Sequence, residues 1–231
     1  MDAFLQSIYE FDLSVFSAVF SIGNDVLDTI MKLITHLGDG WVMPVFAAIL
    51  LLFKKTRKAG MAMLGALLVM VVLNNFILKD IIARVRPCYL FNLEALNANK
   101  EALGNEDYNI ILGKINSLAE KFPELASNWT KGYAFPYIVD MPHSWSFPSG
   151  HTSSSFAFAT AVFANNKKWG IAAYILAALI GFSRIYLGVH YCTDVLAGAV
   201  VGIIYGVIGV LVVGAILKLI KKKDIKLSKL F

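Results

Sequence analysis

The chain has 231 residues, of which 58% are hydrophobic and 16% are charged, and its formal net charge is +5 at pH 7. Soluble domains carry roughly 25% charged residues, so this composition excludes an ordinary soluble domain and indicates one membrane-embedded domain over residues 1–231. The basic residues stand in short clusters beside apolar runs, a pattern that favours orientation in a membrane over binding of nucleic acid. The first basic residue is Lys32, so no secretory signal peptide is expected.

The N-terminal segment, residues 1–23, has apolar residues at steps of three and four from Phe4 to Ile22, and its Gln, Glu and Ser residues fall on the opposite side. This periodicity predicts an amphipathic helix that lies along the membrane interface. Asp12 interrupts the apolar face of this helix. A short membrane span is the alternative interpretation of the segment, and it would bring the number of spans to six.

Five apolar runs follow and predict an all-α fold, a polytopic bundle of membrane helices. The runs are Trp41–Phe53, Gly60–Ile82, Gly150–Asn165, Lys168–Leu187 and Val195–Ile220. A membrane helix needs about 20 residues, so the first run must extend back through Gly38 or pack at a slant.

Basic clusters at residues 54–58, 167–168 and 218–229 set the orientation of these runs. Lys and Arg close to span ends favour the cytoplasm, and all three clusters agree with one five-span arrangement. The sequence therefore predicts a multi-pass protein of the cell membrane. The same arrangement brings the polar segments around Lys79, Gly150 and His190 to one extracytoplasmic face.

A long polar segment, residues 88–147, lies outside in this topology as an extracytoplasmic insertion. Its middle, from Glu106 to Leu125, has the periodicity of an amphipathic helix. Loops of this length are usually functional or disordered. A lid over the site and a surface cap without a catalytic role both remain open.

Two of the polar segments combine cations with a turn. Lys79 and Arg86 are seven residues apart, which predicts that they share a helix face, and Pro87 is expected to end that helix. Arg84 falls off this face and is interpreted as an interfacial or lipid-headgroup contact. In the second segment Ser149 can cap a new helix, and Gly150 lets the backbone approach a ligand before His151. Free N–H groups at a helix N-terminus suit a phosphate.

The third segment contains Arg184, His190 and Asp194. His190 and Asp194 are one helical turn apart, so the carboxylate can hold the Nδ1–H group and leave Nε2 free as a nucleophile. Arg184 offers a bidentate guanidinium to phosphate oxygens. Cations with two histidines and no evident metal ligands predict phosphoryl transfer through a phosphohistidine, without a metal or another cofactor.

The three motifs K-x6-R-P, P-S-G-H and S-R-x5-H-x3-D resemble those of the type 2 phosphatidic acid phosphatase (PAP2) superfamily, over about residues 24–215. The resemblance implies that His190 attacks phosphorus, that Asp194 orients it, and that His151 protonates the leaving oxygen and then activates water. It also implies that the phosphoryl oxygens are bound by Lys79, Arg86, Ser149, Gly150 and Arg184. The implied activity is that of a bacterial membrane lipid phosphatase, with undecaprenyl pyrophosphate, phosphatidylglycerol phosphate, phosphatidic acid or a lipid A phosphate as substrate.

Several alternatives stay open at this level. A lipid phosphotransferase would use the same site, a headgroup binder would use it without turnover, and buried ion pairs could serve the fold alone. His36 and His143 have no partner by spacing and are assigned to loop or interfacial roles. Cys88 and Cys192 form a disulfide or remain two thiols. Close helix packing is predicted at a glycine repeat, within the chain or across a homodimer: Gly198, Gly202 and Gly206.

Overall fold

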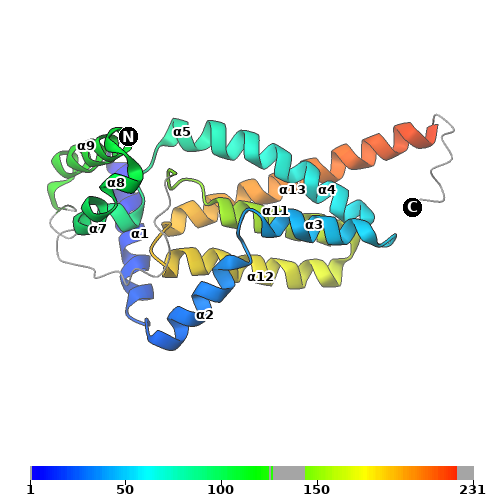
Figure 1. Ribbon diagram of the computed structural model, residues 1–231, viewed down its shortest axis with the longest axis horizontal. Coiled ribbons are helices and arrows are strands. Elements are labelled where there is room, and N and C mark those ends of the chain that lie inside the picture. Colours follow the sequence, from blue (N-terminus) through cyan, green and yellow to red (C-terminus); the bar gives the residue numbers. More distant parts are fainter. Residues whose placement is uncertain (1, 125, 127–143, 223–231) are drawn as a thin grey trace.

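The computed structural model describes residues 2–124, 126 and 144–222. Within these residues the protein is entirely helical with no strand, which confirms the predicted all-α fold class (Figure 1). The bundle consists of α2 (Asp25–His36), α3 (Val42–Leu52), α4 (Arg57–Met70), the π-helix η1 (Val71–Leu78), α5 (Lys79–Ile82), α11 (Gly150–Asn165), α12 (Lys167–Tyr186) and α13 (Cys192–Lys222). At one end of it lie α1 (Asp2–Phe20), α6 (Pro87–Leu90), α7 (Leu93–Ala98), α8 (Lys100–Leu103) and α9 (Asn105–Lys121).

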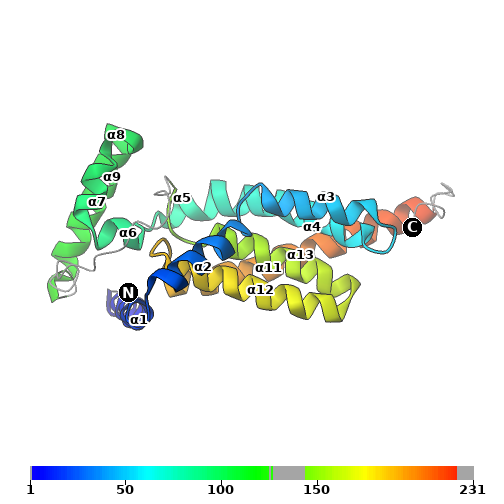
Figure 2. The same ribbon diagram turned by 60° about the horizontal axis from the view of Figure 1, so that its bottom comes forward.

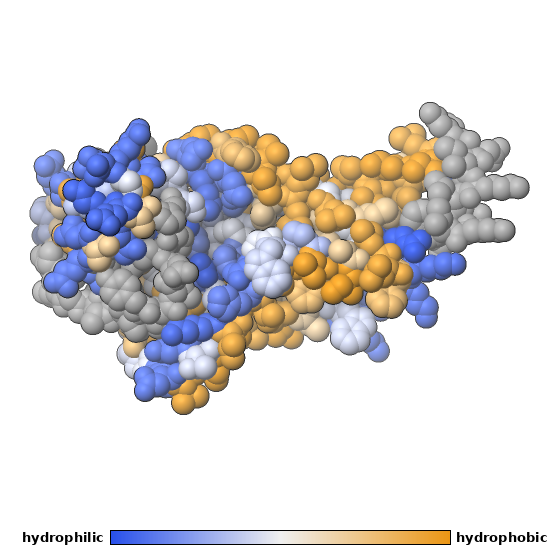
Figure 3. All heavy atoms as spheres, in the orientation of Figure 1, coloured by the Kyte–Doolittle hydropathy of each residue, from blue (hydrophilic) through white to orange (hydrophobic). Residues whose placement is uncertain are grey.

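Three stretches of the described chain are long and apolar enough to cross a membrane: Arg57–Leu90, Lys167–Tyr186 and Cys192–Lys221. The expected spans at α3 and α11 are shorter, with 11 and 16 residues. Because α1 is not among the three, the described chain gives no support to an additional N-terminal span. Figure 3 shows hydrophobic side chains gathered along the bundle and hydrophilic ones at the end that carries α7–α9. These features support a membrane protein, and the five-span topology stays a prediction.

Helix α11 packs against α4, α12 and α13, and the glycine repeat of α13 allows one of these contacts. A Cβ atom added to Gly198 would lie 2.8 Å from the carbonyl oxygen of Ser149, and one added to Gly202 would lie 2.5 Å from the carbonyl oxygen of Ser153. A Cβ atom added to Gly206 would lie 2.5 Å from the Cβ atom of Thr160. The repeat therefore serves helix packing within the chain, which is one of the two alternatives that the sequence left open. Because α11 covers this face, the expectation of a homodimer through the same glycines is not supported.

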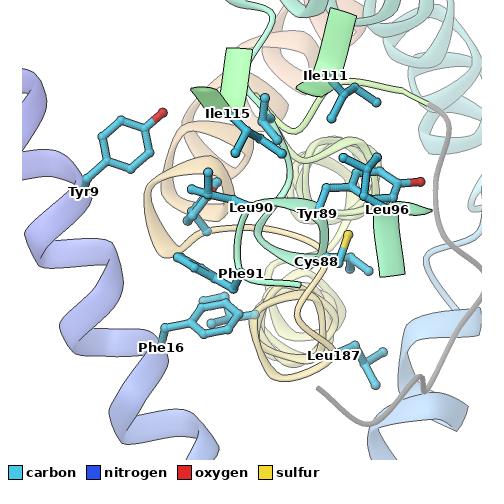
Figure 4. Close-up of a cluster of buried hydrophobic side chains, with 14 of the residues drawn as sticks. Tyr9, Phe16, Cys88, Tyr89, Leu90, Phe91, Leu96, Ile111, Ile115 and Leu187 are labelled. Atoms are coloured by element: carbon cyan, nitrogen blue, oxygen red, sulfur yellow. The ribbon is translucent and has the colours of Figure 1, made fainter. Parts of the chain in front are cut away.

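A cluster of buried apolar side chains, here called the outer cluster, joins α1 and α6–α9 to the ends of α12 and α13 (Figures 1 and 2). Figure 4 shows Tyr9 and Phe16 of α1 facing Leu90 and Phe91, with Ile111 and Ile115 of α9 beside them. The buried side of α1 carries Tyr9, Asp12, Phe16 and Val19, whereas Phe4 and Phe11 of the predicted apolar face are exposed, so that face lies only partly on protein. Cys88 and Cys192 at this end are free thiols in the structure, in line with the second of the two alternatives for these cysteines.

Candidate active site

The chain between α5 and α6 departs from the sequence prediction. Helix α5 ends at Ile82, Ala83 adopts a left-handed conformation with φ 45°, and Pro87 begins α6 instead of ending a helix. Proline is well suited to the first position of a helix because its missing N–H group needs no partner there. The prediction that Lys79 and Arg86 share one helix face is therefore wrong.

Lys79 and Arg86 nevertheless converge on one side chain. Lys79 Nζ donates to Ser144 Oγ at 3.0 Å, and an Arg86 guanidinium nitrogen donates to the same oxygen at 3.0 Å. Arg86 is buried, and its Nε and Nη1 atoms donate to the carbonyls of Ser144 and Val189 at 2.6 and 2.8 Å. Two cations thus lie within a few ångströms of each other, an arrangement suited to an anionic ligand.

His190 lies in the short loop between α12 and α13, where Gly188 has a φ of 72°. Its Nε2 atom accepts a hydrogen bond from Arg86 Nη1 at 3.0 Å. Because a guanidinium can only donate, the proton of the neutral ring lies on Nδ1, which is 3.5 Å from Asp194 Oδ2 and from Ser146 Oγ. The lone pair on Nε2 therefore points toward the cations.

The surroundings of His190 keep its ring neutral. The side chain is buried, which disfavours the charged imidazolium, and Arg86, Arg184 and Lys79 add repulsion. Together these effects hold the pKa of His190 well below its usual value of 6.5. A neutral imidazole is the form that can act as a nucleophile.

Asp194 is fully buried in the first turn of α13. It accepts hydrogen bonds from the Tyr191 backbone at 3.0 Å, from the Ser146 hydroxyl and from Arg84 Nη1 at 2.8 Å. With both oxygens held by donors, the carboxylate is fixed in the orientation that faces His190.

Arg84 contacts Asp194, which the sequence interpretation did not predict. Its side chain is 9% exposed and bridges Asp194 to Asp12 of α1, whose Oδ2 is 2.6 Å from Arg84 Nη2. Its guanidinium carbon lies 3.8 Å from the ring centroid of Tyr191 and 4.9 Å from that of Tyr9. The interfacial role assigned to Arg84 is therefore wrong. Asp12 was the available signal, because a carboxylate on an apolar helix face needs a buried cation.

His151, at the start of α11, has a carboxylate partner of its own. Its Nε2 atom is 3.0 Å from Asp39 Oδ1, and Asp39 Oδ2 is 3.0 Å from His36 Nδ1. Burial raises the pKa of Asp39, but the hydrogen bonds from His36 and His151 outweigh it and hold that pKa below its usual value. The expectation that His36 has no partner is wrong, and Asp39 was missed.

The remaining phosphate-binding candidates surround the start of α11. Ser149 caps this helix by accepting from the Thr152 backbone, as predicted, and its own N–H donates to the Asp194 carbonyl at 3.1 Å. A Cβ atom at Gly150 would meet nothing within 4 Å, so the helix N-terminus has open space beside it. Arg184 is buried and donates to Thr35 Oγ1 at 2.6 Å, while its Nε has no partner in the described part of the chain.

The structure brings the sequence candidates together into one site. Lys79, Arg86, Arg184 and His151 all lie close enough to His190 to interact with it electrostatically. No group of three or more His, Cys, Asp or Glu side chains that could hold a metal is found among residues 2–124, 126 and 144–222. His143 falls outside the described residues.

The chain is similar in sequence to known phosphatases. An undecaprenyl-diphosphatase of Sulfolobus acidocaldarius is 25% identical over 177 residues, which cover 76% of this chain and 66% of that protein. A lipid A 4'-phosphatase of Porphyromonas gingivalis is 25% identical over 208 residues, covering 87% of this chain and 72% of that protein. The chain spans two thirds or less of the length of most of the curated relatives it matches.

The fold is similar to that of a transmembrane PAP2 type phosphatidylglycerolphosphate phosphatase from Bacillus subtilis. The TM-score is 0.57 at 24% identity, covering 95% of this chain and 89% of that one. The profile of the PAP2 superfamily matches residues 59–218, which is more than half of the chain. The resemblance carried by the three motifs is therefore confirmed: the chain belongs to the PAP2 superfamily.

Proposed function

We propose that this protein is an integral-membrane lipid phosphatase that hydrolyses a lipid phosphate monoester or diphosphate through a phosphohistidine on His190. One observation carries the proposal. Nε2 of His190 is 3.0 Å from the Arg86 guanidinium, while Nδ1 faces Asp194. A phosphoryl group bound by Arg86 therefore lies next to a neutral nitrogen lone pair whose ring is held from behind by a carboxylate.

The reaction proceeds in two steps. In the first, Nε2 of His190 attacks phosphorus, the P–O bond to the lipid breaks, and His151 gives its proton to the leaving oxygen. In the second, His151 takes a proton from water, the resulting hydroxide attacks phosphorus, and the P–N bond breaks to release phosphate. Lys79, Arg86 and Arg184 neutralise the phosphoryl oxygens, which is the electrostatic work that a metal ion does in other enzymes.

The substrate is proposed to be a lipid phosphate of the outer leaflet. The named relatives act on undecaprenyl diphosphate and on lipid A, and phosphatidylglycerol phosphate and phosphatidic acid share the same reacting group. In the proposed five-span topology the site faces the extracytoplasmic side. Asp107 and Ile111 of α9 line a small cavity of about 70 Å³ together with Arg86.

Purified protein tests the proposal by phosphate release from each of these lipids in the presence of EDTA. Alkaline quench of the wild type with substrate labelled on phosphorus should trap label that His190→Ala protein does not acquire, because a phosphohistidine is stable in alkali and is lost in acid. Folded His190→Ala protein that keeps more than a few per cent of the activity would contradict the mechanism. Transfer of the label to an added alcohol would instead identify a phosphotransferase.

A further inference from the structure

The loop between α2 and α3 places a second carboxylate against the site. We propose that Asp39 is the positioning residue for His151 and that His36 holds Asp39 in place, an inference that rests on the phosphatase function proposed above. The side chain of His36 is 64% exposed, whereas those of Asp39 and His151 are 28% and 24% exposed. The three residues therefore form a chain that runs from the surface to the proposed acid–base group.

The contacts determine which nitrogen of His151 faces the substrate. Asp39 is ionised and can only accept, so the nitrogen 3.0 Å from it, Nε2, carries a proton. Nδ1 is then the atom left to exchange a proton with the leaving oxygen and with water. His190 has the reverse arrangement, because its carboxylate faces Nδ1 and its Nε2 is left for phosphorus. Each histidine thus has its own aspartate.

The backbone around Asp39 is adapted to this contact. A Cβ atom at Gly38 would lie 2.7 Å from Ile180 Cγ2 and 2.9 Å from His151 Cδ2, so a larger residue would push the loop away from the imidazole. The turn is closed by hydrogen bonds from the Gly38 backbone to Thr35 and from the Val42 backbone to Asp39, both at 2.9 Å. Thr35 also binds Arg184, so the end of α2 supports two groups of the site.

The charges around His151 explain why such a partner is needed. Burial is the largest effect that disfavours the protonated form of His151, and the charges of Arg184 from α12 and of Arg86 from the segment before α6 add to it. Asp39 is the carboxylate that favours the protonated form. Burial and the two guanidinium groups together outweigh Asp39, so removal of Asp39 would disfavour the protonated form of His151 further.

The test is Asp39→Asn, which preserves the shape of the side chain and removes its charge. We expect kcat to fall about 10- to 100-fold, part of the full contribution of general acid–base catalysis, while KM for the lipid substrate stays within about threefold. The alkaline limb of the kcat–pH profile should move to lower pH. Asp25→Asn is the control, because Asp25 is an exposed carboxylate at the opposite end of α2.

A second readout separates proton transfer from structural support. An aryl phosphate with a good leaving group needs little protonation, so Asp39→Asn protein should form the phosphoenzyme from it at a rate close to that of the wild type. A structural defect would slow both substrates equally. His36→Gln should shift the pH profile in the same direction as Asp39→Asn, but by less, because Asp39 remains.

Nitrogen-15 NMR of the histidine rings tests the contact between Asp39 and His151 independently of turnover. The chain has four histidines, so single His→Gln variants assign the signals, and His151 of the wild type should carry its neutral-ring proton on Nε2. A proton on Nδ1 instead, or an Asp39→Asn protein equal to Asp25→Asn in kcat and pH profile, would overturn the proposal. A wild type without phosphate release would reject the phosphatase function, and the ring signals would still report on the Asp39–His151 contact.

Discussion

Replacement of Arg84 by alanine is the most informative single perturbation of the site. In the folded protein this guanidinium lies between two carboxylates, those of Asp12 and Asp194, which are both fully buried. Removing it leaves two negative charges that face each other without a cation. One of the two is the carboxylate that orients His190.

The size of the effect follows from the contacts. Arg84 makes charge-assisted hydrogen bonds at 2.6 and 2.8 Å to the two carboxylates, and hydrogen bonds to charged groups contribute roughly 1.5–3 kcal/mol each. Two of them give about 3–6 kcal/mol, close to the roughly 3–5 kcal/mol lost when one partner of a buried ion pair is removed. Since folded proteins are stable by about 5–15 kcal/mol, the variant should be severely destabilised.

A double-mutant cycle makes this measurable without relying on one unstable protein. Arg84→Gln, Asp12→Asn and their combination are compared by the midpoint of thermal inactivation in detergent, together with kcat. We expect a coupling of about 0.5–3 kcal/mol between the two positions and a loss of kcat in both proteins that lack Arg84. Additive effects, or full activity in a folded Arg84→Gln protein, would refute the role of Arg84 as a support of Asp194.

Three further predictions follow from the same structure. Because the pKa of His190 is lowered, the acid limb of the kcat/KM–pH profile should lie below pH 6.5, and an acid limb above pH 6.5 would contradict this. The free energy of unfolding should decrease as the pH falls below about 6.5, because only the unfolded chain binds a proton on this histidine there. Gly202→Ala places a Cβ atom 2.5 Å from a carbonyl oxygen of α11 and should destabilise the fold by about 1–3 kcal/mol. Gly214→Ala is the control, because its Cβ atom would have nothing within 4 Å; it should leave the midpoint of thermal inactivation unchanged or raise it. Leu118→Ser, in a groove of about 450 Å³ between α1 and α9, should raise KM for long-chain lipids and not for a short soluble phosphate if α9 is a lid.

The helical class and the apolar runs were predictable from the sequence, but the break after Ile82 was not. The residues from Lys79 to Val85 contain neither glycine nor proline, and the spacing of Lys79 and Arg86 fits a helix. Tertiary burial decides the outcome, because Arg84, Val85 and Arg86 are all held inside the protein. An extended segment places consecutive side chains on opposite sides, so it can bury three in a row, which one helix face cannot do.

The residues of the candidate site likewise include some that the sequence predicted and some that it did not. The motif residues were found because their spacing within short segments carries the signal. Asp12, Asp39 and Arg84 were missed because the partners that connect them to the site are far away along the chain: Asp12 lies 72 residues from Arg84, Arg84 lies 110 from Asp194, and Asp39 lies 112 from His151. No local pattern reports such a pair. The spacing of three between His36 and Asp39 was a local signal that the sequence interpretation did not use. A polar residue on an otherwise apolar helix face, such as Asp12, is a sequence signal that indicates a distant buried partner.

The N-terminal helix α1 is the element whose role differs most between the sequence prediction and the structure. Read from periodicity, α1 lies on the membrane interface, and its loss should weaken membrane contact alone. In the structure its inner side supplies Asp12 to Arg84 and packs Tyr9 and Phe16 into the outer cluster. Its outer side exposes Phe4 by 70% and Phe11 by 46%.

These two sides can be tested separately. Replacing Phe4 and Phe11 by serine should leave kcat unchanged, because neither side chain belongs to the buried core. Deleting residues 2–20 should abolish activity although every residue of the three motifs remains, because Arg84 then loses Asp12 and the outer cluster loses its α1 wall. Since Arg84 is one of the donors that hold Asp194 toward His190, the loss should appear in kcat. An active, folded deletion protein would mean that Asp194 alone keeps Arg84 in place and that α1 acts only at the interface.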